Sequence, residues 1–516
     1  MNIFLTLLVS VFLVSPTLAG TVSIYHTGDV HGWYSARAAK WNAEDPSRKI
    51  GGFAALSALL KTEKNPYLLL DSGDMFQGTP EGNYTRGMAS IMLMNKLGYA
   101  AAGVGNHDYD YGEDNLKVLI ASAAFPLLGA NVYYKDSGKN ADYLKPYMIT
   151  EKGGERIAIL GIAGEHTATS TLPANVKHLV FADEPAETAR WMKEILKKRP
   201  DAVVILAHIG IGPFSGRKLD LSTFTFSDAE AAHGTIPVAR ASGGAAVVLG
   251  GHNHTGLLKG YTEKGSGTLI GESFWGLTDV TKVDLHFDDS TGKFTGATAE
   301  LIPLWLDKTG EDPGITAMIE TFSKTVDVEM NKPLGKSAVD LPSSRDGLDS
   351  PIGNWFTDAM RRQSGADIAF QNSAGIRSDL KKGVIKMRDI YQVMPFENTL
   401  VMLTMTGDQI KKLLADNLRG GRSGLQVSGL TVKFGKAAAD KTRELTLERE
   451  GRDIKPGEKF TVATNNYLTT GGTGGKIFGE AEKSEDTMRT IRDLLIKDIS
   501  AHPVTELPEG GRLLRL

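Results

Sequence analysis

Histidine, aspartate and asparagine side chains occur at five points along the chain, each where a short apolar stretch gives way to a polar turn. Two pairs, Asp29 with His31 and His252 with His254, are spaced i, i+2. This spacing places both side chains of a pair on one side of an extended chain. Imidazole and carboxylate ligands suit zinc, manganese or iron. Seven ligands with one shared carboxylate match two divalent ions roughly 3.5–4 Å apart. The predicted metal ligands are Asp29, His31, Asp74, Asn106, His208, His252 and His254.

Each of these pieces has an alternative interpretation when it is taken alone. A single buried histidine is more often a hydrogen-bonded core residue than a ligand, and Gly105-Asn106-His107-Asp108 could be a simple turn. Five sequence segments carry metal-binding side chains, and each lies at the end of an apolar stretch. This recurrence favours a metal centre over five unrelated structural roles.

The apolar stretches that precede these residues have the length and composition of strands, at 22–26, 67–70, 102–104, 202–206 and 246–249. Helical patterns lie between several of them, at 52–61, 88–97 and 185–197. Alternating strands and helices predict an α/β domain. Open α/β sheets place their sites just beyond the carboxyl ends of the strands, where the polar residues gather.

The chain is too long for one ordinary domain, and we expect two. Residues 1–19 resemble a secretory signal, with an apolar run too short to span a bilayer and a small-x-small site ending at Ala19. Its amino-terminal region lacks lysine and arginine, and a cytosolic strand is the less favoured alternative. The predicted location is periplasmic or secreted.

The domain boundary is expected near 303–313, where prolines interrupt the pattern before an amphipathic helix at 315–330. We expect the catalytic domain at 20–306, a linker and hinge helix at 307–332, and the second domain at 333–516.

The charge and the cysteine content of the sequence limit the kinds of partner that we expect. The net charge is −3, from 58 basic and 61 acidic residues, which does not favour nucleic acid as a partner. The sequence contains no cysteine, which excludes disulfides, thiolate metal ligands and a lipid-anchored cysteine. We therefore expect a small-molecule substrate and no membrane anchor, while partner proteins stay unspecified.

The five metal blocks resemble those of the calcineurin-like metallophosphoesterases. They are Asp29-Val30-His31, Gly73-Asp74, Gly105-Asn106-His107-Asp108, Ala207-His208 and Gly250-Gly251-His252-Asn253-His254. The continuation to Gly112, together with 128–131, 352–360 and 371–377, resembles the 5′-nucleotidase and UDP-sugar hydrolase branch. This resemblance implies an α/β protein with an N-terminal four-layer β-sandwich flanked by helices. A second, smaller α/β domain would bind the substrate.

The resemblance also implies roles for the metal ligands. One ion would be held by Asp29, His31, Asp74 and His254, and the other by Asp74, Asn106, His208 and His252, with Asp74 bridging. His107 and Asp110 match the family's catalytic pair. The ions would lower the pKa of a shared water, so that hydroxide attacks the phosphorus without a protein nucleophile. His107, held by Asp110, would stabilise the transition state.

Substrate-binding residues are expected in the second half. Asn372 and Arg377 lie in a glycine-containing segment, where the arginine fork could clamp phosphate, and Arg345 is a further candidate. By resemblance, Tyr467 matches one of two rings that hold a base, and a core aromatic is its alternative role. Leu400 stands at the position of the other ring, and Thr473 stands where the family has an aspartate that holds the ribose.

These residues predict an exported two-metal hydrolase that removes phosphate from nucleoside 5′-monophosphates and could cleave UDP-sugars or related nucleotide esters. Zinc, manganese or a similar divalent ion is the expected cofactor. Two alternatives remain open at this point. One is a hydrolase of the same fold for a cyclic phosphodiester or a sulfur-carrier thiohydrolase substrate. The other is a binding protein that has lost catalysis.

Overall fold

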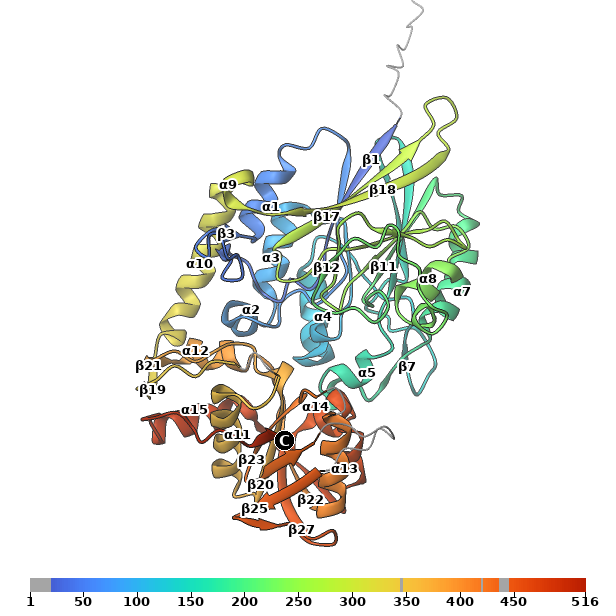
Figure 1. Cartoon of the computed structure of the whole chain (residues 1–516). Helices are drawn as coiled ribbons and strands as arrows, with labels where there is room; N and C mark the ends of the chain where they lie inside the picture. Colours follow the sequence, from blue (N-terminus) through green and yellow to red (C-terminus); the bar gives the residue numbers. More distant parts are fainter. Residues whose placement is uncertain (1–19, 344–346, 419–420, 436–444) are drawn as a thin grey trace, which may run out of the picture.

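The computed structural model describes residues 20–343, 347–418, 421–435 and 445–516, and these form two domains (Figure 1). The predicted signal at 1–19 and the candidate Arg345 lie outside the described residues. Within the described ranges no helix has the length and apolarity needed to cross a membrane.

Two six-stranded sheets form the first domain. The first sheet has the order β18 (Phe294–Pro303), β17 (Asp279–Phe287), β1 (Thr21–Thr27), β4 (Tyr67–Asp71), β5 (Ala101–Gly103) and β6 (Leu127–Leu128). The second has the order β15 (Tyr261–Thr262), β16 (Leu269–Glu272), β13 (Val247–Gly250), β11 (Ala202–Ala207), β9 (Glu155–Ile162) and β8 (Tyr147–Lys152). The strands at the centre of each sheet run parallel, β1, β4 and β5 in the first and β9, β11 and β13 in the second.

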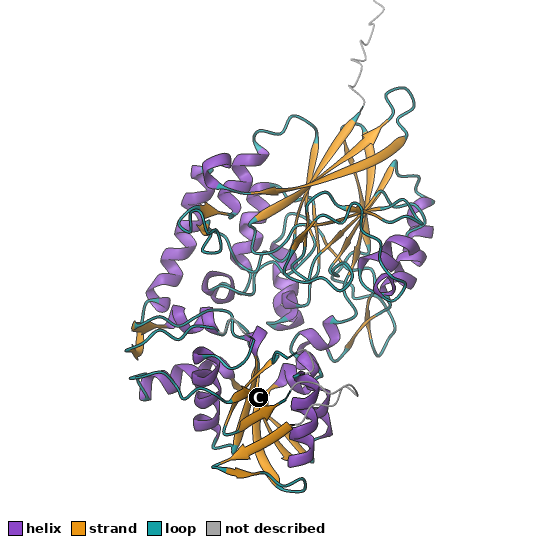
Figure 2. Cartoon of the chain, in the orientation of Figure 1, coloured by secondary structure: helices purple, strands orange, loops and turns teal. Residues whose placement is uncertain are grey.

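The two sheets pack face to face, with helices on their outer faces (Figure 2). Ile24 and Leu70 from the first sheet share one buried cluster with Val204 and Leu249 from the second. One outer layer contains α1 (Phe53–Leu60), α3 (Met88–Leu97) and α4 (Gly112–Ser122), and the other contains α7 (Glu184–Leu196) and α8 (Thr235–Ala241). Strands buried on both faces are apolar along their length, as these are. The predicted four-layer fold is confirmed.

The five strands predicted from apolar stretches are confirmed to within one residue at each end, and so are the three helices. Helix α7 shows why its start could be predicted. The side chain of Asp183 accepts a hydrogen bond from the backbone amide of Ala186, and a proline occupies the first turn. Both features are typical of helix starts.

Helix α10 (Pro313–Met330) runs along one side of the molecule from the first domain to the second (Figure 1). It begins after Asp312, whose side chain accepts from the amide of Gly314 at 2.9 Å. Ile315 and Ile319 pack into the core of the first domain, and the helix also contacts α12 (Met387–Val393) of the second. The predicted amphipathic helix at 315–330 is confirmed.

A five-stranded sheet forms the centre of the second domain. Its order is β23 (Leu425–Ser428), β20 (Ile368–Asn372), β27 (Lys459–Asn465), β22 (Thr399–Thr406) and β28 (Lys483–Thr490). Helices α11 (Pro351–Ser364) and α15 (Ile491–Ala501) cover one face, and α13 (Gly407–Asn417) covers the other. A four-stranded sheet packs nearby, with the order β26 (Arg452–Asp453), β25 (Leu445–Arg449), β24 (Thr431–Phe434) and β29 (Leu513–Arg515).

Candidate active site

The seven predicted metal ligands all follow the carboxyl ends of parallel strands of the first domain. The loops after β1, β4 and β5 carry Asp29, His31, Asp74 and Asn106, and those after β11 and β13 carry His208, His252 and His254. The carboxyl ends of parallel strands meet at one edge of a sheet, and the two sheets are packed together. The fold therefore brings all seven side chains to one place between the two sheets.

Short distances link these side chains. The Nε2 atoms of His31 and His254 lie 3.0 Å apart, and Nδ1 of His252 lies 3.0 Å from Oδ1 of Asn106. Nε2 of His208 lies 3.2 Å from a carboxylate oxygen of Asp74. Two groups have ligand atoms that all lie within 4.8 Å of one another, namely Asp29, His31 and His254, and Asp29, Asp74 and His208.

The hydrogen bonds made by the other ring nitrogens test whether this set fits metal ions. Nδ1 of His31 contacts the carbonyl oxygen of Gln77 at 2.6 Å, and Nδ1 of His208 contacts that of Ser72 at 2.9 Å. A carbonyl oxygen only accepts, so each Nδ1 carries a proton and the neutral ring has a lone pair on Nε2. Those Nε2 atoms face carboxylates and other imidazoles. The donor set therefore fits divalent cations, and backbone carbonyls hold the ligating tautomers.

The pKa values of the site residues also indicate that the site favours a bound cation. Burial raises the pKa of Asp29 to about 7. Burial lowers the pKa of His208, but the carboxylate of Asp74 outweighs it and raises that pKa to about 10. A divalent cation bound between the side chains of His208 and Asp74 would replace the extra proton of His208.

Backbone conformation distinguishes these ligands. Five of the seven have left-handed φ angles, at Asp29 (51°), His31 (50°), Asp74 (59°), His252 (72°) and His254 (55°). Non-glycine residues rarely adopt this region, which costs roughly 1–3 kcal/mol per residue. Such strain persists only where the surrounding structure enforces it, and it clusters at functional sites.

Asp108 holds two of the ligand loops in place. This buried carboxylate accepts hydrogen bonds from the backbone amides of Asp74 at 3.0 Å, Met75 at 3.0 Å and Gly105 at 2.8 Å. It thereby ties the loop that carries Asp74 to the loop that carries Asn106. The sequence pattern alone does not indicate this role.

His107 and Asp110 lie on one short helical turn beside the metal ligands, in and just after η1 (His107–Tyr109). Nδ1 of His107 lies 2.8 Å from a carboxylate oxygen of Asp110, whose other oxygen accepts from the hydroxyl of Thr171 at 2.8 Å. Burial lowers the pKa of His107, but the carboxylates of Asp110 and Asp74 outweigh it and raise the pKa to about 9. The ring can therefore carry a proton at neutral pH.

A cavity of about 210 Å³ joins this turn to the second domain. Asn106, His107, Asp110 and His252 line it from the first domain, and Asn372, Arg377, Phe396, Asn466 and Tyr467 are among the residues that line it from the second. The ring of Phe396 stacks on that of His107, with centroids 5.5 Å apart. The ring of Tyr467 lies against Gly472, where an added Cβ would come within 2.3 Å of it.

Two of the predicted substrate-binding residues do not line this cavity. Leu400 lies in β22, is 1% exposed and packs in the core beneath α11 and α15, which corrects its expected contact with a base. Strand geometry turns this side chain inward, and the ring of Phe396, four residues earlier in the preceding loop, lines the cavity instead. Thr473 follows Gly472 with a left-handed φ of 46° and is also absent from the cavity lining.

A second cavity of about 1070 Å³ is also lined by predicted metal ligands, among them His31, Asp74 and His254. It shares His107, His252, Arg377 and Phe396 with the smaller cavity. It extends along Trp33, Trp41 and Trp275, with the basic side chains of Arg37, Lys40 and Lys218 among them. The sequence does not predict this cavity, because its lining residues have no common spacing in the chain.

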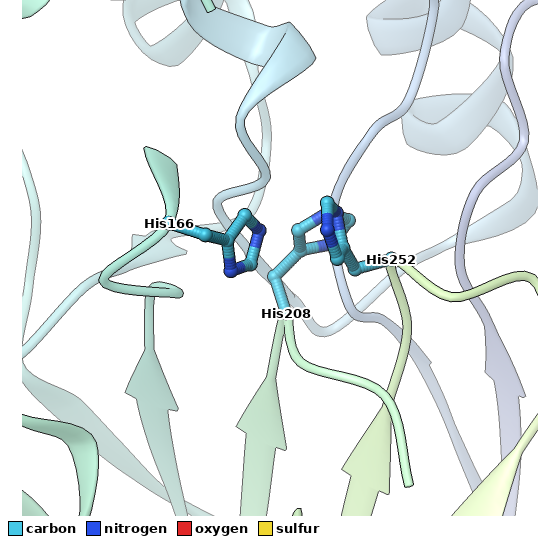
Figure 3. Close-up of side chains that lie close together, drawn as sticks. All are labelled: His166, His208 and His252. Atoms are coloured by element: carbon cyan, nitrogen blue, oxygen red, sulfur yellow. The ribbon is translucent and has the colours of Figure 1, made fainter. Parts of the chain in front are cut away.

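His166 is a further residue that sequence reasoning missed. Its ring joins those of His208 and His252 in a third group whose ligand atoms lie within 4.8 Å of one another (Figure 3). The available signal was its place four residues after the end of β9, the parallel neighbour of β11. A single histidine without a spaced partner carries little weight by itself.

Comparison with known proteins agrees with this geometry. Residues 22–256 match the family model described as calcineurin-like phosphoesterase, and residues 333–480 match that described as 5′-nucleotidase, C-terminal domain. The trifunctional nucleotide phosphoesterase protein YfkN of Bacillus subtilis is 27% identical over 90% of this chain, which spans only about a third of that relative (33%). Protein UshA of Escherichia coli is 25% identical, over 88% of this chain and 86% of UshA.

A solved structure extends the likeness to the arrangement of both domains. The 5′-nucleotidase precursor from Thermus thermophilus superposes with a TM-score of 0.76 at 25% identity, over 96% of this chain and 99% of that one. The two family matches together take in both domains and every predicted metal ligand. The chain therefore belongs to the calcineurin-like phosphoesterases that carry a 5′-nucleotidase C-terminal domain.

Proposed function

We propose that this chain is an exported two-metal hydrolase that removes phosphate from nucleoside 5′-monophosphates. One observation carries the proposal. The 210 Å³ cavity is lined on one side by metal ligands and the His107–Asp110 pair, and on the other by Phe396 and Tyr467. A nucleoside monophosphate has the matching shape, with a phosphate at one end and a flat base at the other.

Each group of side chains has a separate role toward such a substrate. Bound divalent ions supply an activated water and positive charge next to the phosphate. Arg377 can donate to phosphate oxygens, and His107 can hold a proton against the charge that develops on them. Asp110, fixed by Thr171, keeps the His107 ring oriented. Phe396 and Tyr467 contact the base and help to exclude water.

Several finer assignments belong to this proposal. Asp29, His31, Asp74 and His254 hold one ion, and Asp74, Asn106, His208 and His252 hold the other. Export by the signal at 1–19 is also proposed.

A hinge at 307–332 is part of the same proposal, since it would let the second domain move against the first. The backbone carbonyl of Pro395 in the second domain accepts from the side-chain amides of Gln77 and Asn83 in the first, at 2.7 and 2.5 Å. Movement about the hinge would therefore reorganise these contacts.

Phosphate release from AMP by metal-free protein reconstituted with Mn²⁺ or Zn²⁺ tests the proposal. We expect turnover that chelation abolishes, with AMP preferred over p-nitrophenyl phosphate. Parallel assays with a cyclic nucleotide, a sulfur-carrier thioester mimic and single-stranded DNA distinguish nucleotidase activity from the hydrolysis of other esters. Faster turnover of any of these three than of AMP would contradict the proposed substrate class.

The 1070 Å³ cavity favours a second candidate activity, the cleavage of nucleotide esters that carry a group on both sides of the reacting phosphate, such as UDP-sugars. Its tryptophans resemble the flat surfaces on which sugar rings pack, and its basic side chains suit a second phosphate. Trp41 lines this cavity at 65% exposure and can be replaced without opening a core. Trp41→Ala should raise KM for UDP-glucose and leave KM for AMP unchanged. Equal effects on both substrates would exclude this use of the cavity.

A further inference from the structure

His166 lies in the turn between β9 and α5 (Thr167–Ser170), on the side of the site formed by the second sheet. Its ring centroid is 3.6 Å from that of His252 and 6.1 Å from that of His208. One ring nitrogen of each of the three histidines lies within 4.8 Å of the other two. Figure 3 shows the ring of His166 beside the rings of His208 and His252, which overlap in this view, although the three residues come from separate loops. The rings of His166 and His252 are stacked, with their planes 30° apart.

Nε2 of His166 is buried and makes no hydrogen bond within the described residues. Nearly all buried polar side-chain atoms have a partner, so a buried imidazole nitrogen without one calls for an explanation. Nδ1 of His208 faces Ser72 and Nδ1 of His252 faces Asn106, so neither of these two nitrogens is a partner for Nε2 of His166.

The turn around His166 is built to hold the ring in this position. An added Cβ at Gly164 would lie 2.0 Å from Cε1 of His166, so a side chain at 164 would displace the ring. Hydrogen bonds from the amide of Thr167 to Gly164 at 3.0 Å and from that of Thr169 to His166 at 2.9 Å fix the turn. The side-chain amide of Asn106 donates to the carbonyl of Ser170 at 2.9 Å, which ties the short helix to a metal ligand.

We propose that Nε2 of His166 is an additional ligand of the ion held by Asp74, Asn106, His208 and His252. This inference depends on the proposed two-metal function. The ion would then have three imidazole ligands, whereas the other ion has two. Imidazole favours zinc, iron and nickel, while oxygen ligands favour manganese and magnesium. The site beside His166 should therefore select the nitrogen-preferring metals more strongly than the site of Asp29, His31 and His254.

Metal binding tests the proposal without relying on activity. Wild type, His166→Ala and His166→Gln are stripped of metal and titrated with Zn²⁺ by calorimetry, and their bound metal is measured by mass spectrometry. We expect two ions in wild type, and a weaker second ion in both variants, by about 10–100-fold. The visible absorption of Co²⁺-loaded protein should change in the variants, because one nitrogen leaves the coordination shell.

His233→Ala is the matched control. His233 lines the same surface cavity as His166 but belongs to none of the three ligand groups. Its replacement should leave zinc affinity and the cobalt spectrum unchanged. Circular dichroism confirms that each variant is folded. If a His166 variant fails to fold, crystals of zinc-loaded wild type decide the question, with a zinc–nitrogen distance of about 2.0–2.1 Å expected.

The outcomes separate this inference from the proposed function. Two ions in wild type and in both His166 variants, with equal affinity and the same cobalt spectrum, would overturn the role of His166 and leave the two-metal hydrolase intact. One ion in wild type would instead overturn the two-metal assignment itself. A zinc–nitrogen distance in the crystal well beyond the roughly 2.0–2.1 Å of a bond would also overturn the ligand role.

Discussion

Nδ1 of His107 lies 2.8 Å from Oδ2 of Asp110, and the other carboxylate oxygen of Asp110 lies 2.8 Å from the hydroxyl of Thr171. The histidine is thus held by a carboxylate that is itself held by a second residue. This chain of contacts fixes which ring nitrogen faces the cavity. It also keeps a negative charge next to the ring, which favours the protonated form.

Asp110→Asn should move the alkaline limb of the kcat profile to lower pH. The carboxylate of Asp110 raises the pKa of His107 and favours its protonated form, so activity that needs the protonated ring is lost as the pH rises through the pKa of the ring. Removing the charge of Asp110 lowers the pKa, by roughly 1–3 units for a close charge pair. Kinetics with AMP over a pH series measures the shift. An unmoved limb would assign it to another group.

His107→Ala should lower kcat by about 10²–10⁴-fold while the metal content stays the same. The proposed role of the ring is in the transition state, and it does not belong to any of the ligand groups found among the described residues. His178→Ala is the control, since His178 is on the surface and pairs with Glu113. Steady-state kinetics and metal analysis are measured on the same samples. Loss of metal from His107→Ala would instead indicate a ligand role.

Chelation should lower the melting temperature. Ions that bind only the folded protein stabilise it by about 2.7 kcal/mol for each site when free metal is about 100 times its Kd. Without them, the carboxylates of Asp29 and Asp74 remain buried beside each other, and the proton held by His208 offsets only part of their charge. Scanning calorimetry before and after chelation measures the difference, and added Zn²⁺ or Mn²⁺ should restore it. Identical melting curves in all three samples would argue against tight metal binding.

Tyr467→Ala and Phe396→Ala should each raise KM for AMP with a smaller change in kcat. Aromatic contacts of this kind contribute about 0.5–1.5 kcal/mol, which corresponds to roughly 2- to 12-fold in KM. KM for inorganic pyrophosphate or p-nitrophenyl phosphate tests specificity, because neither presents a nucleoside base. A similar rise for these substrates would show that the rings support the site and do not contact the base.

Thr473→Asp should raise thermal stability and leave the preference for AMP over deoxy-AMP unchanged, because Thr473 does not line the 210 Å³ cavity. Thr473 is β-branched with φ 46°, and aspartate and asparagine tolerate this conformation better. Thr473→Asn separates the two effects, because it relieves the backbone without adding a charge. Both variants should melt at higher temperature, and neither should change ribose selectivity. A sharper preference for AMP with the aspartate alone would show that position 473 reaches the ribose.

Much of the first domain could be predicted because chemistry and periodicity agree there. Each apolar stretch is a buried parallel strand, and the residues that follow it have metal-binding side chains. Because parallel strands end at one edge of a sheet, the sequence pattern was enough to gather Asp29, Asp74 and His208. The left-handed backbone of these loops could not be predicted, since it arises from contacts such as those made by Asp108.

The residues that line the substrate cavity were harder to predict, because the position of a strand boundary decides which side chain faces the cavity. Leu400 matches the motif position of an aromatic ring, but β22 begins at Thr399 and turns Leu400 into the core. Phe396 lies just before the strand and remains free to face His107. His166 depends on contacts with His208 and His252, in loops far along the chain, which no local pattern records.

The predicted metal ligands come from both sheets, with Asp29, His31, Asp74 and Asn106 on one and His208, His252 and His254 on the other. Bound ions would therefore act as a cross-link between the two layers, joining loops at opposite ends of the domain's sequence, such as those of Asp29 and His254. Exported proteins commonly use disulfides for this purpose, but this chain has no cysteine. The stability of the packing between the two sheets would then depend on the concentration of divalent metal around the protein, and not on the redox potential.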